Sequence, residues 1–277
     1  MAVKNVFADP DPTWLCPVNP DVREYLAGLV ADLSANYPIS TIELESPTFP
    51  PQLHRHSHYK LGVTMGPIGE FLMQLCFCES CRQRALEAQV DVDMAARSVR
   101  THLERLLQGG GAGGPARAQP GRHVSSLTEF VQRDPAIEAY LRWRQAELTR
   151  VVGMLRSACA CRLIVYVLGD ELQAGADWAQ IGRGVDGLLC QCFDTAEDTV
   201  ERAVDRFAEA AGGVDRLAIG LYAAPPASPD SATLVRRMTR AAELGVRTVN
   251  IYNYGIVPEA NLEWVRQAIR SARRAAQ

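Results

Sequence analysis

The chain has 277 residues, of which 47% are hydrophobic, and a formal net charge of −3 at pH 7. It can therefore bury a large core, and its weak charge, with arginines scattered among acids along the helices, argues against a nucleic-acid-binding protein. No apolar stretch reaches membrane-spanning length, and the first residues lack a signal-peptide core. Since a long chain without such a signal is expected to keep its eight cysteines reduced, we expect a cytoplasmic protein that contacts neither nucleic acid nor membrane.

The N-terminal part of the chain is predicted to be mainly helical. A proline-rich entry precedes an amphipathic helix over residues 20–38, and the segment ISTIELES at residues 39–46 follows as a strand. Further helical patterns cover residues 66–75, 81–108 and 126–158, the last as one or two helices. The glycine-rich residues 109–121 are predicted to form a flexible surface loop.

Four further strands alternate with helices in the C-terminal part. The predicted strands cover residues 162–169, 186–193, 216–223 and 247–255. The predicted helices cover residues 195–213, 228–245 and 259–276. Repeated strand–helix units predict a parallel sheet covered by helices, which is either a (β/α)8 barrel or an open doubly wound sheet. No G-x-G-x-x-G motif follows any strand, so the barrel fits better than a dinucleotide-binding sheet.

We therefore predict an α/β fold in which residues 1–277 form one (β/α)8 TIM-barrel-like domain. Only five strands are recognisable, so we expect the barrel to be partial or truncated at its N-terminus. A partial barrel leaves a sheet edge uncovered, and an uncovered edge favours formation of a homo-oligomer.

A cluster of cysteines carries the clearest local signal. Cys76, Cys78 and Cys81 form a C-x-C-x-x-C run, and Cys16 offers a fourth thiol. Four thiolates complete a closed tetrahedral zinc site, so we predict a structural zinc ion in a subregion spanning residues 16–81. The alternative is that these are free cysteines that pack as small hydrophobic residues. The other four cysteines are expected to be packing thiols: Cys159, Cys161, Cys190 and Cys192.

The strand ISTIELES carries two carboxylates on one face. Side chains alternate along a strand, so Ile42 and Leu44 share one face while Glu43 and Glu45 share the other. In a barrel the apolar pair meets the helices, which directs both carboxylates into the interior near the C-terminal end of the strand. Barrel enzymes carry their reacting groups there. In an open sheet, the same segment would be an exposed edge strand.

Two further segments offer side chains for binding a small-molecule or carbohydrate ligand. The loop after ISTIELES carries candidate substrate or metal contacts and two aromatic surfaces: His54, His56, His58, Lys60, Phe49 and Tyr59. The last strand has a polar face that is predicted to look into the barrel and to suit a hydroxyl-rich ligand: Asn250, Tyr252 and Tyr254. Tyrosines with a satisfied hydroxyl are also ordinary core residues, which is the alternative interpretation.

Together these segments resemble a known enzyme family over residues 5–85. The Cys16–Pro17 segment, the strand that ends in an acidic pair and the Cys-Phe-Cys-x-x-Cys cluster are similar to the zinc-containing β-galactosidase type of barrel glycosidases. The resemblance implies that ISTIELES is the fourth barrel strand, with Glu45 as the general acid/base, and that zinc is bound by Cys16, Cys76, Cys78 and Cys81. It also implies that three strands precede residue 1 and that residues 2–12 resemble a loop.

The chain departs from that family at the second carboxylate. A retaining glycosidase needs a second carboxylate about 5 Å from the first. The family places it on the seventh strand, which here offers Tyr222 but no acid. Asp194 is the preferred replacement, although it could equally cap the next helix. Other candidates are Glu43, Asp170 and Glu171.

We therefore expect a glycoside hydrolase-like enzyme that acts on a sugar or glycoconjugate, with Glu45 as proton donor or base. The alternative is a noncatalytic, degenerate barrel that binds carbohydrate or a protein partner through the same face. A third and weaker hypothesis is a metal-dependent hydrolase built on His54, His56 and His58.

Overall fold

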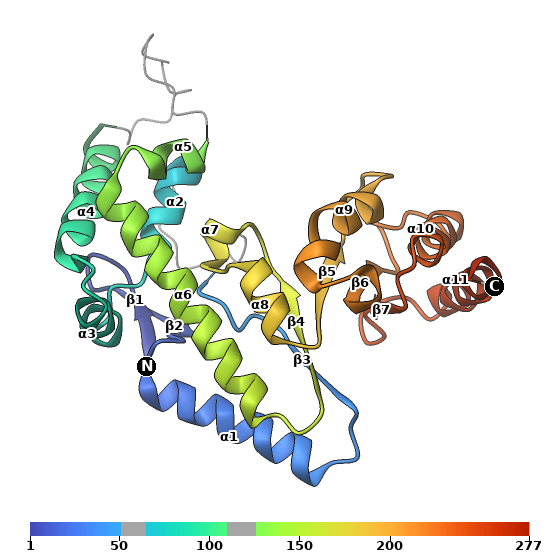
Figure 1. Ribbon diagram of the computed structural model, residues 1–277. Helices are drawn as coiled ribbons and strands as arrows, with labels where there is room; N and C mark the ends of the chain where they lie inside the picture. Colours follow the sequence, from blue (N-terminus) through green and yellow to red (C-terminus); the bar gives the residue numbers. More distant parts are fainter. Residues whose placement is uncertain (51–64, 110–125, 277) are drawn as a thin grey trace. The chain divides into compact units, whose positions relative to one another are not determined.

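The computed structural model describes residues 1–50, 65–109 and 126–276 (Figure 1). The chain divides into two compact units. The cysteine unit, which contains the four cysteines predicted to bind metal, consists of Met1–Leu29, Ser46–Met154 and Gly169–Asp177. The sheet unit consists of Val30–Glu45, Leu155–Leu168 and Trp178–Gln277. The expectation of one barrel-type domain over residues 1–277 stays a prediction.

A five-stranded parallel sheet forms the core of the sheet unit (Figure 1). Its strands are β3 (Thr41–Leu44), β4 (Arg162–Val167), β5 (Gly187–Cys192), β6 (Leu217–Tyr222) and β7 (Thr248–Tyr252). They lie side by side in chain order, and the sheet curls into a half-barrel. The five predicted strands and their parallel pairing are therefore confirmed, and the curled sheet agrees with a partial barrel.

The two faces of this sheet differ in the way that strand alternation predicts. One face is apolar and buried, as shown by Leu163, Val165, Leu188, Ile219 and Leu221. Helices cover this outer face, since α9 (Thr199–Ala211) packs on β5 and β6, and α10 (Ser231–Glu243) packs on β6 (Figure 1). The other, concave face begins with a small apolar cluster and becomes polar toward the C-terminal ends of the strands. The cluster consists of Ile164, Leu189, Ala218 and the partly buried Tyr166.

Helices α9, α10 and α11 (Asn261–Ala275) follow the predicted strand–helix order, and α11 packs along α10. Helix α8 (Trp178–Gly184), which packs on α9, was not predicted. The start of α10 is fixed by Asp230, whose side chain accepts a hydrogen bond of 2.7 Å from the N–H of Thr233. Such an N-cap satisfies one of the main-chain donors that a helix leaves free at its start.

The cysteine unit combines a hairpin with short helices. β1 (Ala2–Lys4) and β2 (Pro10–Leu15) pair antiparallel, so the expectation of a loop over residues 2–12 is wrong. The helices in this unit are α2 (Gly66–Gln74), α3 (Glu79–Glu87), α4 (Val92–Gly109), α5 (Leu127–Gln132) and α7 (Glu171–Ala174). Two long helices begin here and end in the sheet unit: α1 (Pro20–Asn36) and α6 (Pro135–Ala158).

Most of the predicted glycine-rich loop, 109–121, lies outside the described residues. Within the described ranges, no helix combines the length and apolar character that crossing a lipid bilayer requires.

Candidate functional site

Four cysteine side chains converge inside the cysteine unit. Cys16, Cys76, Cys78 and Cys81 are all buried, and their sulfur atoms lie within 4.8 Å of one another. The Sγ of Cys16 lies 3.5 Å from that of Cys81, 3.6 Å from that of Cys78 and 3.9 Å from that of Cys76. Four sulfurs at about 2.3 Å from a tetrahedrally bound ion would be about 3.8 Å apart. The spacing therefore fits a four-thiolate metal centre, and the cluster could hold a metal ion.

The hairpin and the start of α3 bring these cysteines together. Cys16 directly follows β2, and its N–H donates to the carbonyl of Met1 at 2.8 Å. On the other side, the N–H of Lys4 donates to the Sγ of Cys76 at 3.4 Å, and the carbonyl of Lys4 accepts from the N–H of Phe77 at 2.7 Å. Cys78 is the N-cap residue of α3. The missed hairpin is therefore the element that joins the two cysteine segments.

Helix α6 supports the cysteine cluster from one face. Tyr140 is fully buried, and its hydroxyl donates a hydrogen bond to the carbonyl of Cys76. Its ring stacks on Phe77 at a centroid distance of 4.9 Å and on Trp143 at 5.1 Å. This contact fixes the main chain of the C-x-C segment.

Two turns after Tyr140 on α6, Glu147 joins the two cysteine segments by ion pairs. Its carboxylate lies 2.6 Å from Arg23, which also donates to the carbonyl of Pro17, and 3.4 Å from Arg84 on α3. Arg150 pairs with the same carboxylate. Burial acts to raise the pKa of Glu147, but the hydrogen bond from Arg23 and the charges of the other arginines outweigh it and hold this pKa below its ordinary value. The carboxylate is therefore ionised at neutral pH.

The thiols of the cluster differ in how readily they ionise. Hydrogen bonds from Cys16, Cys76 and Cys81 lower the pKa of Cys78. In contrast, hydrogen bonding and burial raise the pKa of Cys81. The hydrogen bond with Cys16 likewise lowers the pKa of Cys76, and lowered pKa values favour the deprotonated thiols that a metal ion requires.

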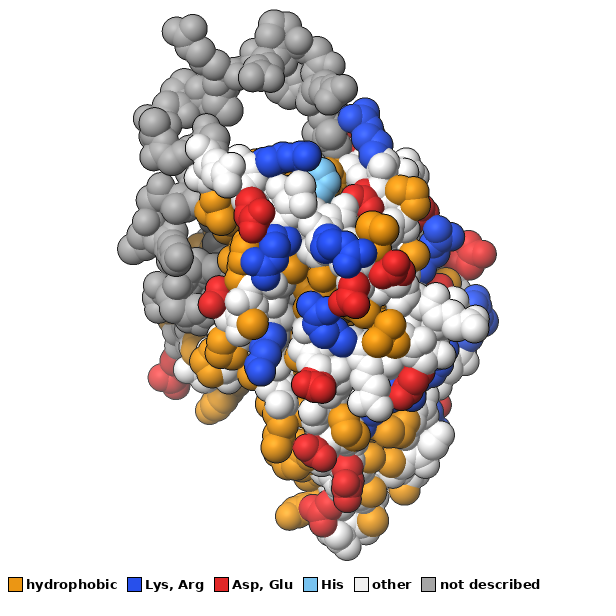
Figure 2. All heavy atoms as spheres, turned by 90° about the vertical axis from the view of Figure 1, so that its left-hand side faces the viewer, with side chains coloured by type: hydrophobic (Ala, Val, Ile, Leu, Met, Phe, Trp, Pro, Cys, Tyr) orange, Lys and Arg blue, Asp and Glu red, His pale blue; other side chains and the backbone are white. Residues whose placement is uncertain are grey.

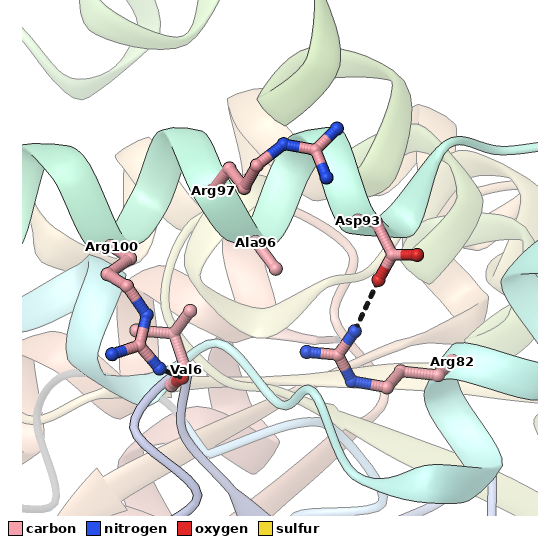
Figure 3. A pocket seen from close by; sticks show the side chains of 6 residues that line it. All are labelled: Val6, Arg82, Asp93, Ala96, Arg97 and Arg100. Atoms are coloured by element: carbon pink, nitrogen blue, oxygen red, sulfur yellow. Dashed lines mark hydrogen bonds and ion pairs between the residues drawn. The ribbon is translucent and has the colours of Figure 1, made fainter.

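A cavity of about 160 Å³ opens on the surface of the cysteine unit (Figure 3). It is lined by Val6, Arg82, Asp93, Ala96, Arg97 and Arg100. Arg82 pairs with Asp93 at 2.7 Å and donates to the carbonyl of Phe77, while Arg100 donates to the carbonyl of Val6 at 2.7 Å. Positive and negative side chains are mixed on this face of the molecule (Figure 2). Since these arginines hold the hairpin and the cysteine loop in place, we assign the cavity a structural role.

The concave face of the sheet unit brings together polar side chains from both of its edge strands. The side-chain N–H groups of Asn250 on β7 lie 2.9 and 2.8 Å from the two carboxylate oxygens of Glu43 on β3. The hydroxyl of Tyr166 on β4 donates to the same carboxylate at 3.3 Å. Burial raises the pKa of Tyr166, against an opposing hydrogen bond from Asn250, and the negative charges of Glu43 and Glu45 raise it further. The charges of both carboxylates therefore reach the Tyr166 hydroxyl on the concave face.

Three aromatic rings meet at the C-terminal ends of the strands. The Tyr252 ring lies 5.3 Å from that of Phe193 and 5.8 Å from that of Tyr222, measured between centroids, and the latter two are 6.0 Å apart. Tyr222 and Tyr252 are the last residues of β6 and β7, and they are paired in the sheet register. Tyr252 remains 42% exposed, so this aromatic cluster is open to solvent. Phe193 was not among the predicted contacts, although it continues the alternation of β5.

The other predicted residues of the sheet unit lie in exposed positions. Glu45 directly follows β3 and is exposed. Asp194 pairs with Arg202 at 2.9 Å and accepts the N–H of Ala196 at 3.0 Å, as a turn residue does. Tyr254 is 82% exposed.

Other predicted contacts lie in the cysteine unit or outside the described residues. Asp170 is the N-cap of α7, where its carboxylate accepts the N–H of Gln173 at 2.9 Å. Phe49 is fully buried, so it offers no exposed surface for stacking on a ligand. The histidine loop falls outside the described residues, which leaves five predicted contacts without a structural account: His54, His56, His58, Tyr59 and Lys60.

The four remaining cysteines occupy the sheet unit. Cys190 and Cys192 lie on β5 and are 8% and 1% exposed, in keeping with packing thiols. Cys159 is buried and Cys161 is partly exposed, and their sulfurs are 3.6 Å apart.

Comparison with known proteins identifies the fold but not a family. The sequence matches neither a protein-family model nor a curated protein. Among solved structures, the catalytic domain of β-amylase from Paenibacillus polymyxa is similar with a TM-score of 0.57 and 14% identity, over 99% of this chain and 74% of that one. A chitinase from Chromobacterium violaceum aligns over 91% of this chain and 97% of its own, with 12% identity and a TM-score of 0.37, which is too low to carry an argument. At 14% identity, the likeness to the β-amylase domain is one of fold alone, and it agrees with the curled parallel sheet of a partial barrel.

Proposed function

We propose that the protein is a glycoside hydrolase-like enzyme whose concave sheet face binds a sugar or glycoconjugate. The observation that carries this proposal is the carboxylate of Glu43, held by Asn250 and Tyr166 on the same face as the open aromatic cluster. Aromatic rings suit the apolar faces of a sugar, and carboxylate, amide and phenol groups suit its hydroxyls. The fold shared with the β-amylase domain supports this choice.

In this proposal, Glu45 is the general acid/base. It follows β3 at the C-terminal end of a parallel strand, on the side that Glu43 shares, and a solvent-exposed carboxylate can exchange its proton between turnovers. Glu43 is engaged by two hydrogen-bond donors, which suits it to orient a sugar or Tyr166 rather than to transfer a proton. Asp194 would serve as the second carboxylate only if Arg202 released it.

We further propose that the metal held by the four cysteines is zinc, with a structural role. Four thiolates leave no open position for substrate, as in closed structural zinc sites. The similarity of the Cys16–Pro17 and C-x-C-x-x-C segments to zinc-containing β-galactosidase-type barrels supports this identity. Metal analysis should find about one zinc per chain, and Cys78→Ser should remove it and partly unfold the protein. A folded protein free of metal would contradict the proposal.

A second candidate function is a noncatalytic barrel that binds carbohydrate through the same face. It is favoured by β6, which ends in Tyr222 where a glycosidase of the resembled family carries its second acid. This candidate keeps the aromatic cluster as a binding surface and assigns no proton transfer to Glu45.

Hydrolysis of a panel of aryl glycosides separates the two candidates. We expect wild type to cleave at least one substrate, Glu45→Gln to abolish turnover, and Glu209→Gln, a matched change at an exposed position on α9, to leave it intact. If wild type cleaves no member of the panel but binds sugars, the noncatalytic candidate replaces the enzyme. If Glu45→Gln stays fully active, Glu45 is not the acid/base.

A further inference from the structure

Arg144 is a buried cation without an acidic partner among the described residues. It lies on α6 and is only 1% exposed. Its Nε and Nη1 have no hydrogen-bond partner in the described part of the chain, and no ion pair joins it to a carboxylate there. Its guanidinium carbon lies 4.2 Å from the centre of the Phe49 ring. Glycine at position 175 makes room for that ring, because a Cβ there would lie only 2.8 Å from the Cδ2 of Phe49.

An unpaired buried guanidinium is costly, so some negative charge must offset it. Burial of a lone charge costs far more than contact with one aromatic ring returns. Arg144 cannot escape this cost by releasing its proton, because a guanidinium stays protonated in proteins. The described residues therefore lack the partner that this charge requires.

The four-cysteine cluster can supply that negative charge when it holds a metal ion. Arg144 lies one helical turn after Tyr140, whose hydroxyl binds the carbonyl of Cys76. Burial lowers the pKa of Arg144, and negative charge on the Cys81, Cys76 and Cys16 sulfurs, once they are ionised, opposes this shift. The field of these sulfurs thus reaches the guanidinium. Four thiolates around one divalent cation carry a net charge of −2, while four protonated thiols carry none.

We propose that Arg144 is the buried counter-charge of the four-cysteine metal centre. It stabilises the metal-loaded form, in which four thiolates leave negative charge inside the protein. It destabilises the metal-free form with protonated thiols, in which its own charge is unpaired. This role rests on the metal centre proposed above. Through Arg144, the stability of the cysteine unit depends on whether the metal ion is bound.

The coupling predicts effects of opposite sign in the two forms. Replacing Arg144 with methionine keeps a long flexible side chain but removes the charge. The metal-loaded protein should become less stable, and the metal-free protein should become equally stable or more stable. A side chain that served only to fill space would lower the stability of both forms alike.

The test compares wild type, Arg144→Met and the control Arg142→Met, whose arginine lies on the same helix with 69% of its side chain exposed. Zinc affinity is measured by competition with a chelator, and thermal unfolding is recorded with and without zinc. We expect Arg144→Met to weaken zinc binding by about tenfold or more without lowering the melting temperature of the metal-free protein. The control should change neither quantity.

Equal loss of stability with and without zinc, at unchanged zinc affinity, would overturn the proposal. Arg144→Lys adds a second arm, since it retains the positive charge. Arg144→Lys should keep a zinc affinity close to that of wild type, and it can be measured even if Arg144→Met does not fold. If Arg144→Lys loses as much zinc affinity as is expected for Arg144→Met, the charge of Arg144 does not stabilise the metal centre. If wild type itself binds no zinc, the metal centre fails first, and this role of Arg144 fails with it.

Discussion

The carboxylate of Glu43 and the amide of Asn250 meet across the concave face of the sheet, although 207 positions separate them in the chain. Both oxygens of Glu43 lie within 2.9 Å of the Asn250 nitrogen. Glu43 lies on β3 and Asn250 on β7, the two edge strands of the five-stranded sheet. Side chains from opposite edges can touch only if the sheet is strongly curled. This contact therefore links the half-barrel shape to the polar face on which the proposed function depends.

Asn250→Asp should remove the hydrogen bonds to Glu43 and replace an attraction between the two side chains with a repulsion. Two carboxylates would then face each other, and the sheet unit should lose about 1 kcal/mol of stability at neutral pH, a modest figure because Glu43 is exposed. Urea unfolding at pH 7 measures this loss. A variant as stable as wild type at pH 7 would show that the two strands are not held together by this contact.

Gly182 tests how closely α8 and α9 pack. A Cβ at this position would lie 1.9 Å from the carbonyl oxygen of Ala210, which belongs to a helix backbone and cannot move aside alone. Gly182→Ala should therefore destabilise the protein by about 2 kcal/mol or more. Gly184→Ala is the matched control in the same helix, since no atom lies within 4 Å of the added Cβ. If the two variants unfold at the same denaturant concentration, the described helix packing is wrong.

Glu147 makes a pH-dependent contribution to stability. Its pKa is lower in the folded protein than in the unfolded chain, so its ion pairs stabilise the fold above the unfolded pKa. This contribution is lost as pH falls through the folded pKa. Glu147→Gln should cost about 2 kcal/mol at pH 7. The difference between the variant and wild type should narrow below about pH 4.5.

Glu138→Gln is the control for that measurement. Glu138 lies on the same helix and pairs with the exposed Arg142, so its removal should cost little at any pH. Denaturant unfolding at a series of pH values gives all three curves. A difference between Glu147→Gln and wild type that stays constant from pH 7 to pH 3 would show that the carboxylate charge does not stabilise the fold.

The sheet was predictable because its strands are short apolar runs rich in β-branched residues. Buried parallel strands have this composition, and helical patterns between them fixed the strand order. The hairpin was missed because β2 begins Pro10-Asp11-Pro12, residues that are depleted in strands. Its pairing with β1 depends on contacts that a local pattern does not contain.

The candidate sites were only partly predictable for the same reason. The spacing of Cys76, Cys78 and Cys81 indicates their convergence on one ion, and alternation along β3 places Glu43 on the polar face. By contrast, Arg144 and Glu147 on α6 look like surface charges in the sequence. Their burial follows from the position of α6 against the cysteine cluster, and only the tertiary structure reveals it.

Sugar binding to the inactive variant tests the central claim most directly. Calorimetric titration of Glu45→Gln with an oligosaccharide panel should detect binding, because the concave face and its aromatic cluster remain intact. Adding Tyr252→Ala should weaken this binding by about tenfold, since loss of one stacking ring costs on the order of 1 kcal/mol or more. Adding Tyr37→Phe, a change at an exposed tyrosine outside the aromatic cluster, should not affect it. Sugar binding that is unchanged by loss of Tyr252, or absent from both wild type and Glu45→Gln, would contradict the assignment of this face as the carbohydrate site.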